Sequence, residues 1–189
     1  MKNIAIFASG SGTNAGNIIR YFENHPNVRV DSVWSNKKEA YVLQRAQDLG
    51  VEAKYFTREQ FRGSDQIVKE LQHRNVELVV LAGFLLLVPP EFVEAFTIIN
   101  IHPALLPAYG GKGMYGSIVH ESVLRNHEKE SGITIHLVNN EYDKGKHLLQ
   151  VKCPVFPDDT PEMLAARIHE LEYAYFPRAI EDFLNRTDI

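Results

Sequence analysis

The sequence predicts an α/β fold: a doubly wound, mostly parallel sheet with an antiparallel extension toward the C-terminus. Three observations lead to it. Apolar, strand-like segments alternate with amphipathic stretches through the first hundred residues. The run 78–82 is continuously apolar, which is typical of a central parallel strand covered on both faces. Two later apolar segments, 134–138 and 148–155, are joined by a connection too short for a crossover helix, so we expect them to pair antiparallel.

In the first half, each strand is expected to lead into a helix. The helix at 15–24 carries Ile18, Ile19 and Phe22 at helical spacing. Gly50 follows the second helix, where a helix C-terminus favours glycine. The series comprises strands at 3–8, 28–35, 51–55, 78–82 and 98–101 and helices at 15–24, 40–49, 64–73 and 90–96. This alternation is Rossmann-like.

The second half is organised differently. A helix is expected at 117–125, before the two antiparallel strands. A long amphipathic helix at 161–184 closes the chain, and we expect it to be kinked or interrupted at Pro177, which lacks a backbone N–H. We therefore expect a single domain, 1–189, made of a phosphate-binding half at 1–101 and a closing half at 102–189.

Composition excludes several classes of protein. A net charge of −4 and a pI near 6.1 argue against a nucleic-acid-binding protein, which presents a basic face. Cys153 is the single cysteine, so we expect neither a disulfide framework nor a cysteine zinc site, and a cytoplasmic protein fits. Gly10 interrupts the N-terminal apolar segment too early for a signal peptide, and no apolar run is long enough to span a membrane.

The loop 9–14 (S-G-S-G-T-N) joins the first strand to the first helix. Its glycines allow a ligand close to the backbone, and the helix N-terminus offers free N–H groups, so the loop suits a phosphate. It matches neither the dinucleotide motif G-x-G-x-x-G nor a P-loop, which favours a mononucleotide-like phosphate. A plain turn between strand and helix explains the loop equally well.

Asn100 and His102 stand two residues apart at the end of the fifth strand, so they point to the same face. A carboxamide that holds a carbonyl oxygen, beside an imidazole that handles a proton, suits acyl-type chemistry. A loop histidine satisfied by backbone groups is the alternative. The position of the pair favours a functional role, because ligands of open α/β sheets bind beyond the carboxyl ends of the strands.

Three other segments are candidates for the same site. Asp143 lies in a polar turn where a carboxylate would orient an imidazole, with Glu141 as a competitor and an ordinary turn as the alternative. The apolar run 84–88 suits a pocket wall for a flat ring, or is a buried connection. Four glycines within 110–116 indicate either a mobile lid or a plain surface loop.

Two kinds of site are not expected. The histidines form no helical pair at i, i+3 or i, i+4 and there is no H-E-x-x-H motif, which argues against a metal site. The absence of a G-x-S-x-G elbow argues against a Ser-His-Asp hydrolase.

Together these segments resemble the folate-dependent formyltransferases, from Ile4 to Phe183. The segment N-I-H-P-A-L-L-P at 100–107, with D-x-G from Asp143, is specific for that superfamily, and the loop 9–14 narrows it to the glycinamide ribonucleotide branch. Further matching stretches are Ser35-Asn36, Leu81-Ala82-Gly83-Phe84 and Gly132-x-Thr134-x-His136-x-Val138.

The resemblance implies a reaction. The formyl group of the co-substrate 10-formyltetrahydrofolate passes to the primary amine of glycinamide ribonucleotide, a step of de novo purine biosynthesis that needs no metal. The implied partners are these two small molecules, with the chain a monomer or homodimer and with neither nucleic acid nor membrane involved. The closing half would then be the folate side.

The resemblance also assigns residues. Asn100, His102 and Asp143 are the implied catalytic groups: Asn100 holds the developing oxyanion, His102 stabilises the tetrahedral intermediate, and Asp143 raises the pKa of His102. The remaining implied residues are Gly12, Thr13 and Asn14 for the substrate phosphate, Glu172 for the ribose, and Leu85, Leu86, Leu87, Val88, Asn100, Asn139, Asn140, Glu141 and Asp143 for the folate. His120 and His136 match positions behind these contacts, and a side chain at Gly12 is expected to block the phosphate.

The sequence departs from the family pattern on the folate side, and other functions of the same fold remain as alternatives. Family members often carry an arginine in the segment occupied here by Leu85, Leu86 and Leu87, and another near Ser64. Formyltetrahydrofolate hydrolase and methionyl-tRNA formyltransferase share the fold, but normally carry an N-terminal regulatory and a C-terminal basic domain, respectively. A non-catalytic nucleotide-binding module is the remaining alternative.

Overall fold

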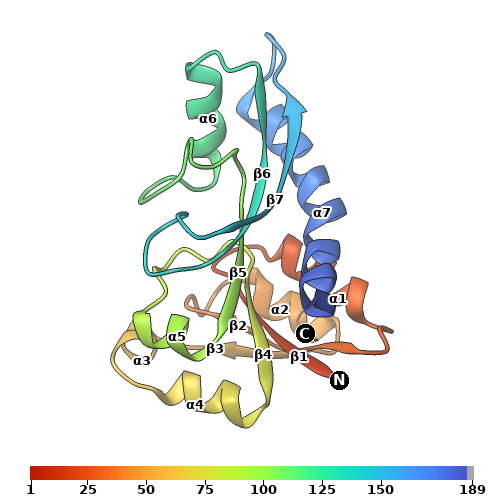
Figure 1. The fold of residues 1–189 in the computed structure, drawn as a ribbon, viewed down its shortest axis with the longest axis vertical. Coiled ribbons are helices and arrows are strands. Elements are labelled where there is room, and N and C mark those ends of the chain that lie inside the picture. The colour runs from red at the N-terminus through yellow and green to blue at the C-terminus, as the bar shows by residue number, and fades with distance from the viewer. Residues whose placement is uncertain (187–189) are drawn as a thin grey trace.

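The computed structural model describes residues 1–186, which form a seven-stranded sheet with helices on both faces (Figure 1). The strands are β1 (Lys2–Phe7), β2 (Val28–Ser35), β3 (Glu52–Tyr55), β4 (Val76–Leu81), β5 (Thr97–His102), β6 (Glu130–Leu137) and β7 (His147–Pro154), in the order β3-β2-β1-β4-β5-β6-β7. β1 to β5 pair in parallel, and β6 is antiparallel to both β5 and β7. The predicted fold class is confirmed; residues 187–189 of the predicted closing half lie outside the described residues.

Two helical layers enclose the sheet. The helices are α1 (Thr13–Phe22), α2 (Tyr41–Asp48), α3 (Arg58–Arg62), α4 (Gln66–His73), α5 (Pro90–Ala95), α6 (Ser117–Arg125) and α7 (Pro161–Arg186). α1, α2 and α7 pack on one face and α3, α4 and α5 on the other, while α6 lies against α7 beside the long β6–β7 pair (Figure 1).

Strand alternation sends β1 side chains to two separate cores. Ile4 and Ile6 join the core under α1, α2 and α7, whereas Ala5 and Phe7 join the core under α3, α4 and α5. In the second core Phe7 stacks on Trp34 with ring centroids 5.8 Å apart. The apolar run 78–82, which includes most of β4, is buried throughout, as expected for a central parallel strand covered on both faces.

Two local expectations need correction. α3 was not predicted, although Thr57 and Gln60 form a capping box at its start, a signal that the sequence contains. The expected interruption at Pro177 is wrong, because α7 continues through this residue. Phe176 and Ile180 are fully buried on either side of it, so packing holds the helix despite one missing backbone donor.

The antiparallel extension brings the candidate catalytic side chains together. β5 pairs with β6 so that Asn100 lies opposite His136 and His102 opposite Thr134. The turn after β6 then returns Asp143 toward the end of β5. Among the described residues, we find no helix with the length and apolar character required to cross a membrane.

Candidate active site

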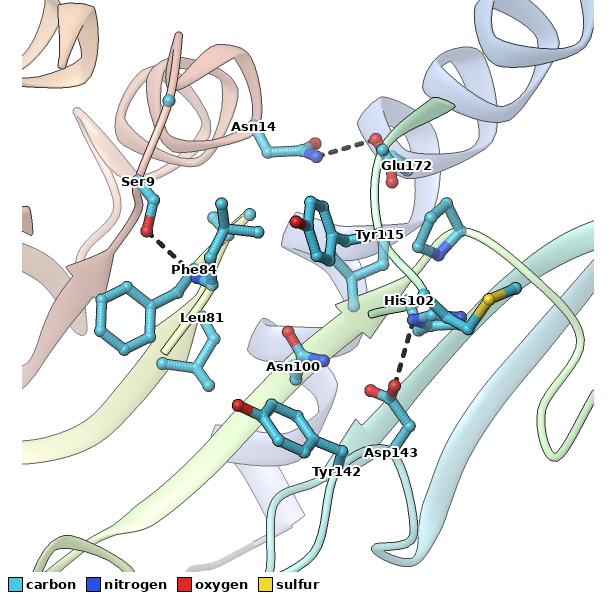
Figure 2. Close-up of a pocket in the computed structure, with 18 of the residues that line it drawn as sticks. Ser9, Asn14, Leu81, Phe84, Asn100, His102, Tyr115, Tyr142, Asp143 and Glu172 are labelled. Atoms are coloured by element: carbon cyan, nitrogen blue, oxygen red, sulfur yellow. Dashed lines mark hydrogen bonds and ion pairs between the residues drawn. The ribbon is translucent and has the colours of Figure 1, made fainter. Parts of the chain in front are cut away.

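A cavity of about 810 Å³ opens at the carboxyl ends of β1, β4 and β5. Its wall includes the loop 9–14 after β1, the segment 81–88 after β4, and Asn100 and His102 at the end of β5. The glycine-rich loop 111–117 and the turn before Asp143 complete it (Figure 2). This position is the one expected for a ligand site of an open α/β sheet.

His102 is held at one ring nitrogen and faces Asp143 with the other. The residue is 4% exposed. Nε2 lies 2.7 Å from the backbone carbonyl oxygen of Tyr109, which requires a hydrogen on Nε2. Nδ1 lies 3.6 Å from Oδ2 of Asp143, too far for a hydrogen bond but close enough for an ion pair once Nδ1 is protonated (Figure 2). In the neutral ring, Nδ1 is therefore the free base.

Burial controls the charge of His102. It lowers the pKa of the ring below its usual 6.5, and the opposing effects of Asp143 and the Tyr109 carbonyl do not cancel it. Asp143 does act in the expected direction, but the net shift is downward. The free protein thus holds His102 neutral at neutral pH.

Asp143 connects three groups in this site. Its Oδ2 accepts a hydrogen bond of 2.9 Å from the backbone N–H of Gly111, and its Oδ1 lies 3.6 Å from Nε2 of His136. Burial alone would raise the pKa of this carboxyl, but His136, His102 and the Gly111 N–H together lower it below 3.8. Asp143 is therefore a carboxylate at neutral pH.

His136 orients the amide of Asn100. Nδ1 of His136 lies 2.8 Å from the carbonyl oxygen of Leu137 and donates to it. In the neutral ring Nε2 is then an acceptor, and it lies 3.2 Å from Nδ2 of Asn100. One Nδ2 hydrogen of Asn100 is used in this way, and the second remains to donate into the cavity.

The first turn of α1 offers an anion site. α1 begins at Thr13 after Gly12, and no side chain caps it. Gly12 has φ +69°, and a Cβ there would lie 2.2 Å from Cγ2 of Val42. Gly12 is thus required by the packing of α2 against the loop. The sequence-based expectation that a side chain there would block the phosphate stays a prediction.

Glu172 joins α7 to the first turn of α1. Its Oε2 accepts a 2.8 Å hydrogen bond from Nδ2 of Asn14 and lies 2.9 Å from Nδ1 of His169 (Figure 2). The hydrogen bond to Glu172 raises the pKa of His169. The carboxylate is 5% exposed and lines the cavity, which suits the binding of hydroxyl groups.

The chain matches a known family over almost its whole length. The family model described as formyl transferase matches residues 2–180. The chain belongs to the formyltransferase family. This formyltransferase is 38% identical to phosphoribosylglycinamide formyltransferase of Haemophilus influenzae, over 97% of this chain and 87% of the relative.

Other relatives agree in fold and differ in length. The chloroplastic phosphoribosylglycinamide formyltransferase of Arabidopsis thaliana is 40% identical over 95% of this chain, which spans 64% of the relative's length, just under two thirds. The crystal structure of phosphoribosylglycinamide formyltransferase from Streptococcus pneumoniae superposes with a TM-score of 0.85 at 35% identity, covering 97% of this chain and 99% of that one.

Most of the expected folate-side residues of this formyltransferase line the cavity. Leu85, Leu86, Leu87 and Val88 form one wall, and Asn139 and Glu141 contribute to the opposite one. Asn140 does not line the cavity and is exposed. Residues 139–143 form an irregular turn after β6, so no periodic pattern could separate Asn140 from its neighbours.

Several cavity residues of the formyltransferase were not predicted from the sequence. Tyr115 points into the cavity from the glycine-rich loop, and Tyr142 reaches it beside Asn100 (Figure 2). His169 pairs with Glu172 at i, i+3 on α7, a helical spacing that was present in the sequence. Among residues 1–186, no cluster of three or more His, Cys, Asp or Glu side chains has metal-site geometry.

Proposed function

We propose that this chain transfers the formyl group of 10-formyltetrahydrofolate to the amine of glycinamide ribonucleotide, giving formylglycinamide ribonucleotide. One observation carries the proposal: Asn100, His102 and Asp143 meet in a cavity whose far end is the uncapped N-terminus of α1. The relatives named as phosphoribosylglycinamide formyltransferases support the same reaction.

Asn100 stabilises the charge that develops on the formyl oxygen. Its free Nδ2 hydrogen donates to that oxygen as the amine adds to the formyl carbon and the carbonyl becomes an oxyanion. Because His136 already holds the amide in place, little reorganisation is needed when the charge appears. Loss of one such donor typically costs about 10²–10³ in kcat.

His102 carries the proton from one nitrogen to the other. Its Nδ1 takes the proton released by the attacking amine and delivers it to the folate nitrogen as the bond from that nitrogen to the formyl carbon breaks. Asp143 faces the imidazolium that exists between these two steps and stabilises it. The Tyr109 carbonyl keeps the other nitrogen protonated throughout.

The two substrates occupy opposite ends of the cavity. The phosphate of glycinamide ribonucleotide is bound by backbone N–H groups of Gly12, Thr13 and Asn14, and its ribose hydroxyls donate to Glu172. The wall Leu85–Val88 and the turn 139–143 hold the pterin ring, for which an apolar wall with a few polar groups is suited. Each end would draw residues from both proposed halves, 1–101 and 102–189, since Glu172 belongs to the phosphate end and Leu85–Val88 to the pterin end.

The setting of the reaction follows from composition. A net charge of −4 supports small-molecule substrates without nucleic acid, and a single buried cysteine fits the reducing cytoplasm. We propose a cytoplasmic enzyme that works without a membrane or metal, as a monomer or homodimer.

A transfer assay tests the proposal. The purified chain is mixed with 10-formyltetrahydrofolate, and tetrahydrofolate and formylglycinamide ribonucleotide are measured with and without glycinamide ribonucleotide. The proposal predicts equal amounts of both products, and none without the acceptor. Release of formate in the absence of acceptor would identify a hydrolase, and no turnover would favour a nucleotide-binding module.

A further inference from the structure

His120, in the first turns of α6, lines the reaction cavity but makes no hydrogen bond that explains its burial. The residue is 4% exposed, and its Nδ1 is enclosed without a hydrogen-bond partner among the described residues. A buried polar atom without a partner destabilises the fold, so such atoms are rare in native proteins. An apolar side chain of similar size would avoid this cost.

The enclosed nitrogen decides how the ring can act. A buried N–H without an acceptor is rarer than a buried lone pair without a donor, so the ring hydrogen belongs on Nε2. Burial lowers the pKa of His120 below 6.5, with His169 acting in the same direction, which keeps the ring neutral. Nε2–H is then the polar group that His120 presents to the cavity.

The neighbours of His120 indicate which part of the substrate it would contact. The ring lies near enough to Glu172, His169 and His102 for the charges of all three to act on it. Glu172 marks the proposed ribose end of the cavity, and His102 marks the reacting amine. In glycinamide ribonucleotide one amide group and one methylene separate the ribose from that amine, and the amide carbonyl oxygen needs a donor when water is excluded.

We propose that His120 binds the linker amide of glycinamide ribonucleotide, through a hydrogen bond from Nε2–H to the amide carbonyl oxygen. The inference rests on the proposed function and adds a contact that selects the acceptor. It also explains why a polar ring is kept at a buried position: the group is unfavourable in the free protein and useful in the complex.

Equilibrium binding to the whole protein separates this role from a structural one. Calorimetric titrations use two probes, glycinamide ribonucleotide and ribose 5-phosphate, which lacks the linker amide. The variants are His120→Leu, which removes the donor, and His120→Gln, which retains one. His73→Leu on the exposed end of α4 is the matched control.

We expect His120→Leu to weaken the binding of glycinamide ribonucleotide about tenfold, which is the effect of one hydrogen bond in a closed site. The affinity for ribose 5-phosphate should not change. His120→Gln should recover part of the loss, and the melting temperature of His120→Leu should not fall. Equal weakening of both probes, or unchanged affinity for glycinamide ribonucleotide, would overturn the inference. The wild-type transfer assay reports separately on the proposed function, so the two failures are distinguishable.

Discussion

Nε2 of His102 donates to the backbone carbonyl oxygen of Tyr109 at 2.7 Å, and this single contact fixes the tautomer of the ring. The free nitrogen, Nδ1, faces Asp143 at 3.6 Å. An imidazole that is held at one nitrogen and free at the other is suited to accept and return a proton without rotating.

Removing the imidazole should abolish most turnover. We expect His102→Ala to lower kcat by about two orders of magnitude, because both the proton carrier and the imidazolium are lost. Binding of glycinamide ribonucleotide, measured by calorimetry, should change little. His73→Ala, on the exposed end of α4, is the control. Near-normal turnover of His102→Ala would contradict the proposed role.

Neutralising Asp143 should have a similar effect with the fold preserved. Asp143 has φ +55°, a left-handed conformation that asparagine tolerates, and the new amide oxygen can still accept from Gly111. We expect Asp143→Asn to lower kcat about 100-fold, because the imidazolium of His102 loses its counter-charge. Steady-state kinetics beside the exposed control Asp158→Asn would show it, and an unchanged kcat would contradict the role proposed for Asp143.

Stability should depend on pH through His102. Its pKa in the folded protein is below 6.5, so under acidic conditions the unfolded chain binds a proton that the folded chain does not. The free energy of unfolding should therefore fall as the pH drops below 6.5. Urea unfolding at pH 7 and pH 5 measures the change, and the decrease should be smaller in His102→Gln. Equal decreases in the two proteins would show that His102 is not the group responsible.

Activity should follow the same titration. Because Nδ1 must be unprotonated to accept the proton of the amine, kcat/KM should decline on the acid side, with its midpoint below 6.5. In Asp143→Asn the carboxylate no longer favours the imidazolium, so the residual activity should decline at a still lower pH. A shift of this acid-side midpoint to higher pH in Asp143→Asn would contradict the roles proposed for His102 and Asp143.

Two glycines of the same loop should respond differently to alanine. At Gly12, the added Cβ would lie 2.2 Å from Val42, in a backbone conformation that strains other residues; at Gly10 it would meet nothing within 4 Å. Gly12→Ala should reduce the free energy of unfolding by about 1–3 kcal/mol and weaken the binding of glycinamide ribonucleotide. Gly10→Ala should leave the melting temperature unchanged. Equal melting temperatures would show that α2 moves away at little cost.

The sequence predicted the parts of the site that depend on local pattern. Asn100 and His102 share a face because strand side chains alternate, and the loop 9–14 meets them because parallel strands end at one edge. Spacing could not choose between Glu141 and Asp143. The structure separates them, since Asp143 reaches His102 while Glu141 pairs with Lys144.

Contacts between residues far apart in the sequence could not be predicted from local patterns. Asn14 and Glu172 are 158 positions apart, and their hydrogen bond exists only because α7 packs across α1. The net pKa of His102 depends on how deeply the ring is buried, which no local motif records. The missed helix α3 is different, because its capping box was readable at Thr57 and Gln60.

The bond between Asn14 and Glu172 also has a consequence for protein synthesis. A ribosome synthesises the loop 9–14 early and α7 last, so the nascent chain contains only part of the proposed nucleotide site for most of its translation. The acceptor pocket closes only when the final helix docks. A polypeptide released before residue 172 therefore lacks the carboxylate that we propose to bind the ribose.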